Sequence, residues 1–409
     1  MKKFLLLGAA AMLAGSVIAQ TITGKMTLDW EHSMADHTGA ETRSIGQLGK
    51  QALVPNYTTG KLEVWDATGK VKEYDVNTWL TANKADINPD DGAAYTMGRG
   101  VSTDEAGNII VNLQFPGVVS STKFLAIKPD GTMKYIPCEF PSALGATNGR
   151  MDFLGDKSAG DVFNNGFIVA CPNTVQYAVV YNIFEGEQDT EFSYGVKIGD
   201  AENTESWNTE SSAIFLEPLA ADAQHAPKFI ARNRNMAGYR LSADGESAMQ
   251  KITLPDGSTL GFGIASTTNF TAFTVGGESY VVGNQPDPSK SDPTSISART
   301  HYWEVKKVST GETMATWSMP TGEACDYNVG FASSVNEDGS VNIYQFNKGI
   351  RLAKYTLAAD FTGINNVIAD ADENAPVEYY NLQGVKVEKP ENGIFIKKQG
   401  AKATKIVAE

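Results

Sequence analysis

The sequence is poor in the residues that build disulfide frameworks. Its 409 residues include three cysteines, Cys138, Cys171 and Cys325. An odd number leaves at least one thiol without a disulfide partner. Cys138 and Cys171 could pair, but their flanks, IPCEF and IVACP, are typical of strand ends, which favours ordinary apolar packing for all three cysteines. Their disulfide state stays open.

Histidine is also scarce. The four histidines, His32, His37, His225 and His301, are scattered along the chain. His32 and His37 lie near carboxylates in sequence, but their spacing has no i,i+4 helical register and no cysteine accompanies them. We therefore expect no metal ion and no cofactor.

Long apolar runs are confined to the first residues. Lys2 and Lys3 precede an apolar stretch over residues 4–18, and Val17-Ile18-Ala19 offers the small-residue pattern that a signal peptidase needs. Later runs are too short for a membrane helix. We predict a signal peptide over residues 1–19 and a mature chain without a transmembrane segment. The expected location is periplasmic, cell-surface or extracellular.

The chain has fewer basic than acidic residues. The chain has 34 Lys and Arg residues against 48 Asp and Glu residues, a net charge of −14. Nucleic-acid binding demands a basic surface, so we exclude nucleic acid as a partner.

Catalytic signatures are missing as well. The sequence has no G-x-S-x-G elbow, no H-E-x-x-H motif, no P-loop and no calcium-binding loop. Carboxylates are plentiful, so a glycosidase with two catalytic carboxylates stays open. No pair stands out, and we predict no catalytic residue.

The sequence does contain many short alternating β-type runs that end in glycine-containing turns. Such turns close tight hairpins, because Gly, Asn and Asp tolerate positive φ. The best helix candidate covers only residues 78–85. The turns occur at residues 66–69, 104–107, 129–131, 243–245, 255–257, 309–311 and 337–339.

The β runs recur as units of about 40–60 residues with four strands each, which is the pattern of a β-propeller. We predict about six blades within residues 20–360. The last copy lacks a fourth strand, which residues 21–31 can supply, and this would close the ring. A pair of β-sandwiches is the alternative, but it does not explain the four-strand period. The copies cover residues 43–76, 99–137, 150–199, 211–254, 261–320 and 329–357, with GIASTTN (residues 263–269) as the first strand of the fifth.

Arginine begins three successive copies, at Arg43, Arg99 and Arg150. Loops that lead into first strands gather on one face of a propeller, so we expect these guanidinium groups to bind an anionic ligand there. Trp207 and Tyr327, in later copies, are candidates to stack on a sugar. The alternative is that the arginines bind backbone carbonyls and acidic residues of neighbouring blades.

Two further segments on this face stay open between function and ordinary loop. Residues 229–240 concentrate arginine and asparagine, and residues 283–300 form a long loop rich in Pro, Ser and Asp.

The chain ends in a small β module. Residues 361–376 have the composition of a linker, and residues 377–409 contain three β-type runs separated by turns. Three short strands bury little apolar area, which favours a signal or docking role.

This module resembles the C-terminal sorting domains of secreted Bacteroidetes proteins (type IX secretion-like). The resemblance is carried by YNLQG, by GIFI and by a lysine-rich final run. It implies recognition by secretion machinery and display at, or release from, the cell surface. The body resembles, more loosely, uncharacterised propeller-like proteins of the same bacteria. The matching positions that define the motif are Tyr380, Leu382, Gly384, Gly393, Ile394 and Ile396.

Three functions remain. The first is a secreted or cell-surface binding protein that engages a glycan or protein ligand through the channel face. The second is an extracellular propeller enzyme, a glycan lyase or hydrolase. The third is a non-catalytic surface scaffold or adhesin.

Overall fold

The computed structural model divides into two compact units, residues 1–357 and residues 358–409. Among the described residues, no helix is both long and apolar enough to span a membrane. The expected signal peptide lies outside the described residues. The structure describes residues 21–37, 45–88, 93–114, 123–139, 156–170, 177–197, 213–216, 229–232, 238–240, 250–261, 270–284, 302–318, 329–362, 376–380, 386–387, 393–399 and 402–408.

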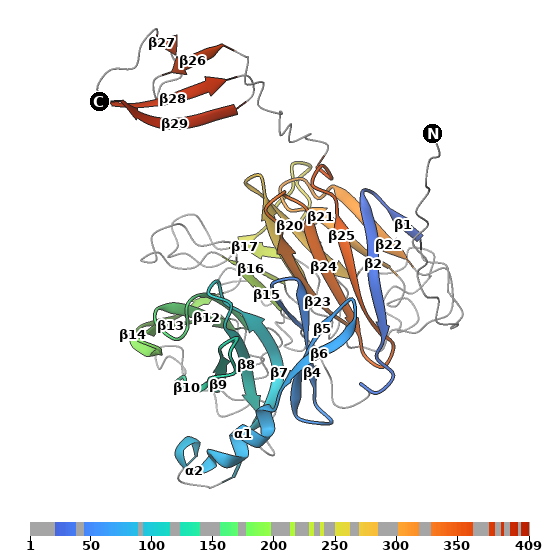
Figure 1. Ribbon diagram of the computed structural model, residues 1–409, viewed down its shortest axis with the longest axis vertical. Helices are drawn as coiled ribbons and strands as arrows, with labels where there is room; N and C mark the ends of the chain where they lie inside the picture. Colours follow the sequence, from blue (N-terminus) through green and yellow to red (C-terminus); the bar gives the residue numbers. More distant parts are fainter. Residues whose placement is uncertain are drawn as a thin grey trace, which may run out of the picture. The chain divides into compact units, whose positions relative to one another are not determined.

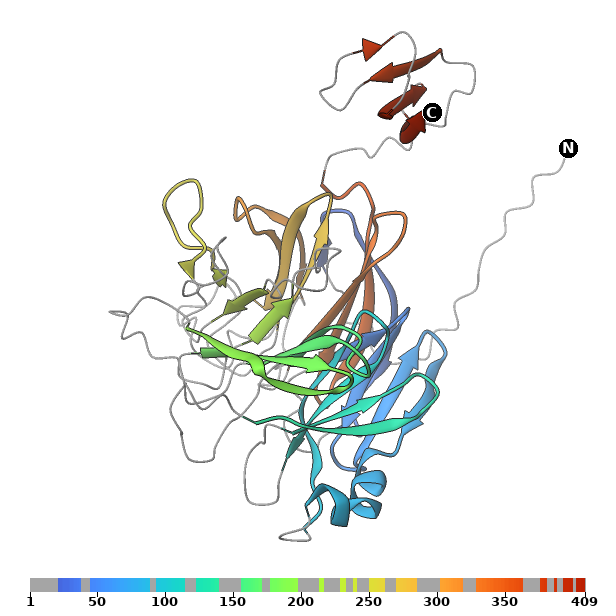
Figure 2. The same ribbon diagram turned by 90° about the vertical axis from the view of Figure 1, so that its left-hand side faces the viewer.

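In its described residues, the first unit contains six antiparallel sheets (Figures 1 and 2). The first sheet holds β3 (Gly46–Leu48), β4 (Gln51–Asn56), β5 (Lys61–Asp66) and β6 (Gly69–Tyr74). The second holds β7 (Thr96–Thr103), β8 (Ile109–Gln114), β9 (Lys123–Ile127) and β10 (Met133–Pro137). The third holds β11 (Asp156–Gly160), β12 (Gly166–Ala170), β13 (Tyr177–Phe184) and β14 (Glu187–Lys197).

The remaining sheets of this unit are built alike. The fourth holds β15 (Ala213–Leu216), β16 (Phe229–Arg232), β17 (Gly238–Arg240) and β18 (Gln250–Lys251). The fifth holds β19 (Thr271–Val275), β20 (Glu278–Asn284), β21 (Tyr302–Lys307) and β22 (Thr313–Ser318), with β1 (Thr21–Thr23) beside β22. The sixth holds β23 (Val329–Val335), β24 (Val341–Asn347) and β25 (Arg351–Leu357), with β2 (Met26–Ser33) beside β25.

The first strands of successive sheets pack against one another. β3 contacts β7, β7 contacts β11, β11 contacts β15, β15 contacts β19, β19 contacts β23, and β23 contacts β3. Four-stranded sheets that meet through their first strands make the fold β-propeller-like. A pair of β-sandwiches would instead bury two large sheets face to face.

The four-strand periods match the predicted copies, with one correction. The fifth copy was expected to begin with residues 263–269, which lie outside the described residues, whereas the first strand of that sheet is β19. The run TAFTV in β19 precedes the Gly276-Gly277 turn, and both glycines have positive φ. This turn, which the sequence pattern missed, sets the strand position.

The N-terminal segment contributes to two sheets. β2 pairs with β25 and completes the sixth sheet, as predicted for residues 21–31. β1 pairs with β22 and makes the fifth sheet five-stranded, which was not predicted. Gly24 lies between the two strands with a φ of 76°. A side chain there would overlap Met314 and Ala315, so the crossing between the sheets requires glycine.

Two short helices lie in the connection between the first and second sheets. α1 (Val76–Ala82) and α2 (Lys84–Ile87) cover the predicted helical residues 78–85. The Asp75 carboxylate caps α1 by accepting a hydrogen bond from the Thr78 amide at 3.2 Å. Val76 and Leu80 are buried, so the helix is held by its apolar side.

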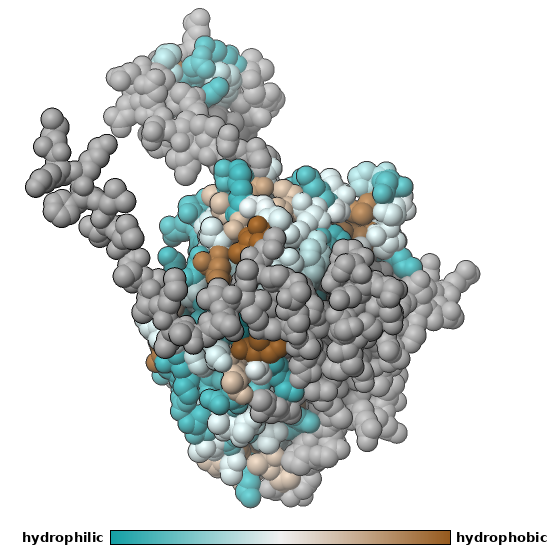
Figure 3. Space-filling model, turned by 90° about the vertical axis from the view of Figure 1, so that its right-hand side faces the viewer, coloured by the Kyte–Doolittle hydropathy of each residue, from teal (hydrophilic) through white to brown (hydrophobic). Residues whose placement is uncertain are grey.

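Apolar layers between neighbouring sheets form the core. Leu53, Val64 and Val111 belong to the layer between the first and second sheets, and Ile168 and Tyr181 to the layer between the second and third. Burying an aliphatic side chain such as Leu53 or Ile168 contributes about 1.5–3 kcal/mol. On the face in Figure 3, hydrophilic and neutral residues predominate among the described residues, and hydrophobic ones form small separate patches.

The described part of the second unit forms a sheet of four strands rather than the predicted three. β26 (Val377–Tyr380) pairs with both β27 (Lys386–Val387) and β28 (Gly393–Gln399), and β28 pairs with β29 (Lys402–Ala408). The hairpin turn predicted at Gln383-Gly384 lies outside the described residues, and β26 and β27, on either side of it, pair antiparallel. The additional strand arises because residues 394–409, expected as one run, contain β29 as well as most of β28.

Candidate functional site

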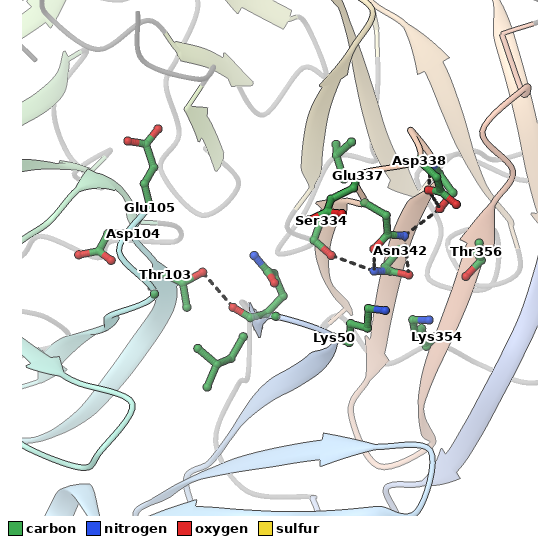
Figure 4. Close-up of a pocket in the computed structure, with 17 residues that line it drawn as sticks. Lys50, Thr103, Asp104, Glu105, Ser334, Glu337, Asp338, Asn342, Lys354 and Thr356 are labelled. Carbon is green, nitrogen blue, oxygen red and sulfur yellow. Dashed lines mark hydrogen bonds between the residues drawn. The ribbon is translucent and has the colours of Figure 1, made fainter. Parts of the chain in front are cut away.

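A cavity of about 930 Å³ lies where the turns after three first strands meet (Figure 4). Its walls come from the β3–β4, β7–β8 and β23–β24 turns and from β25. Most lining side chains are polar. They include Gln47, Lys50, Thr103, Asp104, Glu105, Ser334, Asn336, Glu337, Asp338, Ser340, Asn342, Lys354 and Thr356.

Gln47 and Thr103 join two walls of this cavity. The Thr103 hydroxyl donates to the Gln47 backbone carbonyl at 2.9 Å, which ties β7 to β3. The Gln47 side-chain oxygen Oε1 is buried and has no hydrogen-bond partner among the residues that the structure describes. A buried acceptor without a donor costs stability, so this oxygen is an available contact for a bound hydroxyl or amide.

Amide and hydroxyl groups form the wall from the sixth sheet. Asn342 Nδ2 donates to Ser334 Oγ at 3.1 Å and to Asn336 Oδ1 at 2.9 Å. Asn336 Nδ2 donates in turn to Ser340 Oγ at 2.9 Å. This network fixes the orientation of each group, so the wall presents a preorganised polar surface.

The Asp338 carboxylate stabilises the β23–β24 turn. It accepts hydrogen bonds from the Ser340 hydroxyl at 2.6 Å and the Ser340 amide at 2.9 Å. These bonds lower the pKa of Asp338 below its ordinary value, with a smaller contribution from the charge of Lys50. The carboxylate is thus ionised at neutral pH and engaged in its own turn.

Asp104 has a comparable role in the β7–β8 turn. It is 7% exposed and accepts from the Asn108 amide at 2.7 Å, from Asn108 Nδ2 at 2.9 Å and from the Val162 amide at 2.9 Å. Burial raises the pKa of Asp104, the nearby Asp161 adds to the rise, and the three hydrogen bonds oppose it. Asn108 Nδ2 also donates to Asp161 Oδ1 at 2.9 Å, which links the second and third sheets.

Two lysines bring positive charge to the cavity. Lys354 Nζ lies 2.6 Å from Asp29 Oδ2, and the Thr356 hydroxyl donates to the same oxygen at 2.7 Å. Lys50 lies in the β3–β4 turn (Figure 4). The cavity therefore combines ammonium, amide, hydroxyl and carboxylate groups.

The predicted ligand-binding residues mostly lie outside the described residues, namely Arg43, Arg150, Trp207 and Tyr327. The backbone of Arg99 lies in β7, within an irregularity of the β7–β8 pairing between Met97 and Val101. Bulges of this kind re-aim the backbone and are frequent beside binding sites. The cavity lies at the other end of β7, beyond Thr103.

The predicted sorting motif is described in part. Tyr380 ends β26, and its hydroxyl donates to Glu378 Oε2 at 2.7 Å. Gly393, Ile394 and Ile396 lie in β28. Leu382 and Gly384 lie outside the described residues.

The two histidines near the N-terminus contact the first sheet. His32 Nε2 lies 2.6 Å from the Asp66 carbonyl oxygen, and His37 Nε2 lies 2.9 Å from Glu63 Oε2. Within the described ranges, no group of three or more His, Cys, Asp or Glu side chains is arranged to hold a metal ion. Cys138 is buried, and burial raises the pKa of its thiol.

The cavity residues were not identified as a site from the sequence. The turns at residues 104–107 and 337–339 were recognised, but only as hairpin turns. Their meeting depends on the contacts of β23 with β3 and of β3 with β7, which sequence spacing does not reveal.

No protein-family model and no curated protein matches this sequence. Several solved structures are similar. A DUF4623 family protein from Bacteroides eggerthii DSM 20697 is 12% identical, with a TM-score of 0.47, over 82% of this chain and 76% of the other. Virginiamycin B lyase from Staphylococcus aureus is 11% identical, with a TM-score of 0.41, over 83% and 100%. BBS1N, in complex with ARL6DN, is 10% identical, with a TM-score of 0.40, over 82% and 97%. Likenesses this remote carry no information about ligand or reaction.

Proposed function

We propose that the chain is a secreted or cell-surface binding protein that takes a polar ligand, a glycan fragment, in the cavity between the β3–β4, β7–β8 and β23–β24 turns. The proposal includes a six-bladed propeller whose ring is closed by the pairing of β2 with β25. Export rests on the basic and apolar start of the sequence and on the motif of the C-terminal unit, which would engage secretion machinery.

The observation that carries this proposal is the polar lining of the 930 Å³ cavity. Sugars present many hydroxyl groups, each of which both donates and accepts hydrogen bonds. Fixed amides such as Asn342, the lysines and the unpartnered Gln47 oxygen match that mixture.

Binding is favoured over hydrolysis by the state of two cavity carboxylates. Asp104 and Asp338 are engaged by amide and hydroxyl donors of their own turns or of the next sheet. A general acid or base must instead be free to exchange a proton with substrate. These contacts suit a rigid binding wall.

The test is a glycan-array comparison of the wild-type protein with two double variants. Lys50→Ala/Asn342→Ala alters the cavity, and Arg99→Ala/Arg150→Ala removes two of the arginines predicted from the sequence to bind the ligand. We expect the cavity variant to lose at least 10-fold in affinity, about 1.4 kcal/mol, and the arginine variant to retain binding.

Loss of binding only in the arginine variant would show that the ligand binds at the arginines predicted from the sequence instead of in the cavity. Absence of glycan binding by the wild-type protein would overturn the glycan proposal. Release of a shortened sugar from a bound glycan would replace it with an enzymatic function.

A further inference from the structure

Arg351, between the fifth and sixth sheets, has two buried side-chain nitrogen atoms without a hydrogen-bond partner among the described residues. It begins β25 and is 3% exposed. Its Nη1 atom donates to Glu31 Oε2 at 3.2 Å, and its guanidinium carbon lies 4.1 Å from the centre of the Trp317 ring. These two nitrogens are Nε and Nη2, which make no hydrogen bond within the part of the chain that the structure describes.

The Nε and Nη2 groups of Arg351 form one edge of the planar guanidinium. Their N–H bonds point the same way, and their spacing matches the two oxygens of a carboxylate. Glu31 is bound through Nη1, so this bidentate edge is vacant. Buried charged donors are normally satisfied, because leaving them unpaired costs stability.

On the fifth sheet, one row of side chains faces the sixth sheet and supplies two further buried donors. Asn284 is opposite Trp303 in the β20–β21 register, and Trp303 is opposite Trp317 in the β21–β22 register. Asn284 and Trp303 are 3% and 0% exposed, and their Nδ2 and Nε1 atoms are buried with no hydrogen-bond partner in the described ranges. Together with Arg351 Nε and Nη2, these are four buried donor atoms in the same layer.

The row of Asn284, Trp303 and Trp317 packs against the side chains of the sixth sheet in one layer. The Trp303 ring lies 5.8 Å from Phe331 and 5.2 Å from Tyr355, both in the sixth sheet, between ring centroids. The Arg351 guanidinium lies over the face of the Trp317 ring. Stacking on Trp317 holds the guanidinium plane in a fixed orientation.

We propose that Arg351 binds a small carboxylate anion through Nε and Nη2, with Asn284 Nδ2 and Trp303 Nε1 as neutral donors in the same layer. The ligand is anionic because all four atoms are donors and two of them belong to the Arg351 cation. It is small because these atoms are shielded from solvent by the packed aromatic rings.

This site is separate from the cavity of the proposed function. Side chains alternate between the two faces of a strand, so Arg351 and Tyr355 lie on one face of β25, and Lys354 and Thr356 lie on the other. The cavity is lined by the second face. The carboxylate site can therefore exist whether or not the cavity binds a glycan.

The test uses formate as the probe, with the full chain. Thermal unfolding is measured in sodium formate and in sodium chloride at equal ionic strength. We expect formate to raise the wild-type Tm by about 2 °C or more, with a response that saturates. Arg351→Lys, which keeps the charge but loses the two-donor edge, should abolish the response. Lys354→Gln, on the opposite face of the same strand, should retain it.

Equal wild-type Tm values in the two salts would overturn the proposal, as would an undiminished formate response in Arg351→Lys. Should Arg351→Lys fail to fold, the wild-type crystal structure in formate decides. A planar anion on the Nε/Nη2 edge would support the site, and water molecules alone there would refute it.

Discussion

His37 and Glu63 form a buried pair that joins the N-terminal segment to the first sheet. His37 Nε2 lies 2.9 Å from Glu63 Oε2, and the two side chains are 7% and 3% exposed. Asn56 Nδ2 donates to Glu63 Oε1 at 3.1 Å, and Trp65 Nε1 donates to Glu63 Oε2 at 3.0 Å. Since β2 belongs to the sixth sheet and β5 to the first, this pair links the last sheet to the first.

The Glu63 carboxylate should make stability depend on pH. Burial alone would raise its pKa, but hydrogen bonds from His37 and Asn56 and the charges of His37 and Lys70 lower it to about 2, from 4.5. A lowered folded-state pKa stabilises the fold above about pH 4.5, and this contribution is lost as the pH falls toward 2.

Glu63→Gln should therefore lower the free energy of unfolding by about 2–3 kcal/mol at pH 7 and by much less near pH 2.5. Urea unfolding at both pH values measures the difference. Glu73→Gln, an exposed neighbour in β6, is the control and should change stability by less than about 1 kcal/mol. A loss in Glu63→Gln that is equal at both pH values would contradict the assignment.

Gly24 should tolerate no side chain. Gly24→Ala would place a methyl group against Met314 and Ala315, in a left-handed conformation with a φ of 76°. The expected loss is about 2–4 kcal/mol, in part from the positive φ. Gly257→Ala is the matched control, because Gly257 has a φ of 84° and open space around it. Equal losses in denaturant unfolding of the two variants would show that the close contact is unimportant.

Asn108 should be sensitive to a change of charge. It donates to both Asp104 and Asp161, so Asn108→Asp would bring three carboxylates together. We expect a loss of about 2–4 kcal/mol at pH 7 that is partly regained near pH 4, where protonation relieves the repulsion. Asn108→Ala should show no such recovery. A pH-independent loss in Asn108→Asp would refute the electrostatic explanation.

Deletion of one terminal region should lower the Tm of the first unit strongly, whereas deletion of the other should leave it nearly unchanged. Removal of residues 21–33 exposes the edges of β22 and β25, because β1 and β2 pair with them. We expect a Tm lower by more than about 10 °C and aggregation through the open edges. Removal of residues 358–409, which form a separate unit, should leave the Tm of the first unit within about 2 °C. A similar Tm loss in both deletions would argue against these unit boundaries.

Several features of the fold were predictable because they depend on local chemistry. Asp66, Asp104 and Asp338 lie in turns that close hairpins by accepting nearby amide hydrogen bonds, and the sequence identified all three turns. The helix over residues 78–85 and the pairing partner of β25 were also predicted. The role of β1 was not, because its three residues show no period and their place is set by the edge of β22.

The candidate sites were much less predictable. Gln47, Thr103 and Asn342 are separated by long stretches of chain and look like ordinary strand residues in the sequence. Arg351 drew no attention, because nothing in the pattern of β25 distinguishes a buried guanidinium from an exposed one. The predicted ligand residue Arg99 lies in a strand irregularity, but its role stays a prediction.

The sequence by itself determined the β-rich character, the four-strand period and the positions of most turns, since backbone preference and hydrogen bonding within a few residues decide these. The tertiary structure alone decided which turns meet around the cavity and which face of β25 carries Arg351 toward Trp317. Those relationships arise from packing between sheets, where residues about 300 positions apart, such as Ala52 and Phe346, belong to one apolar cluster.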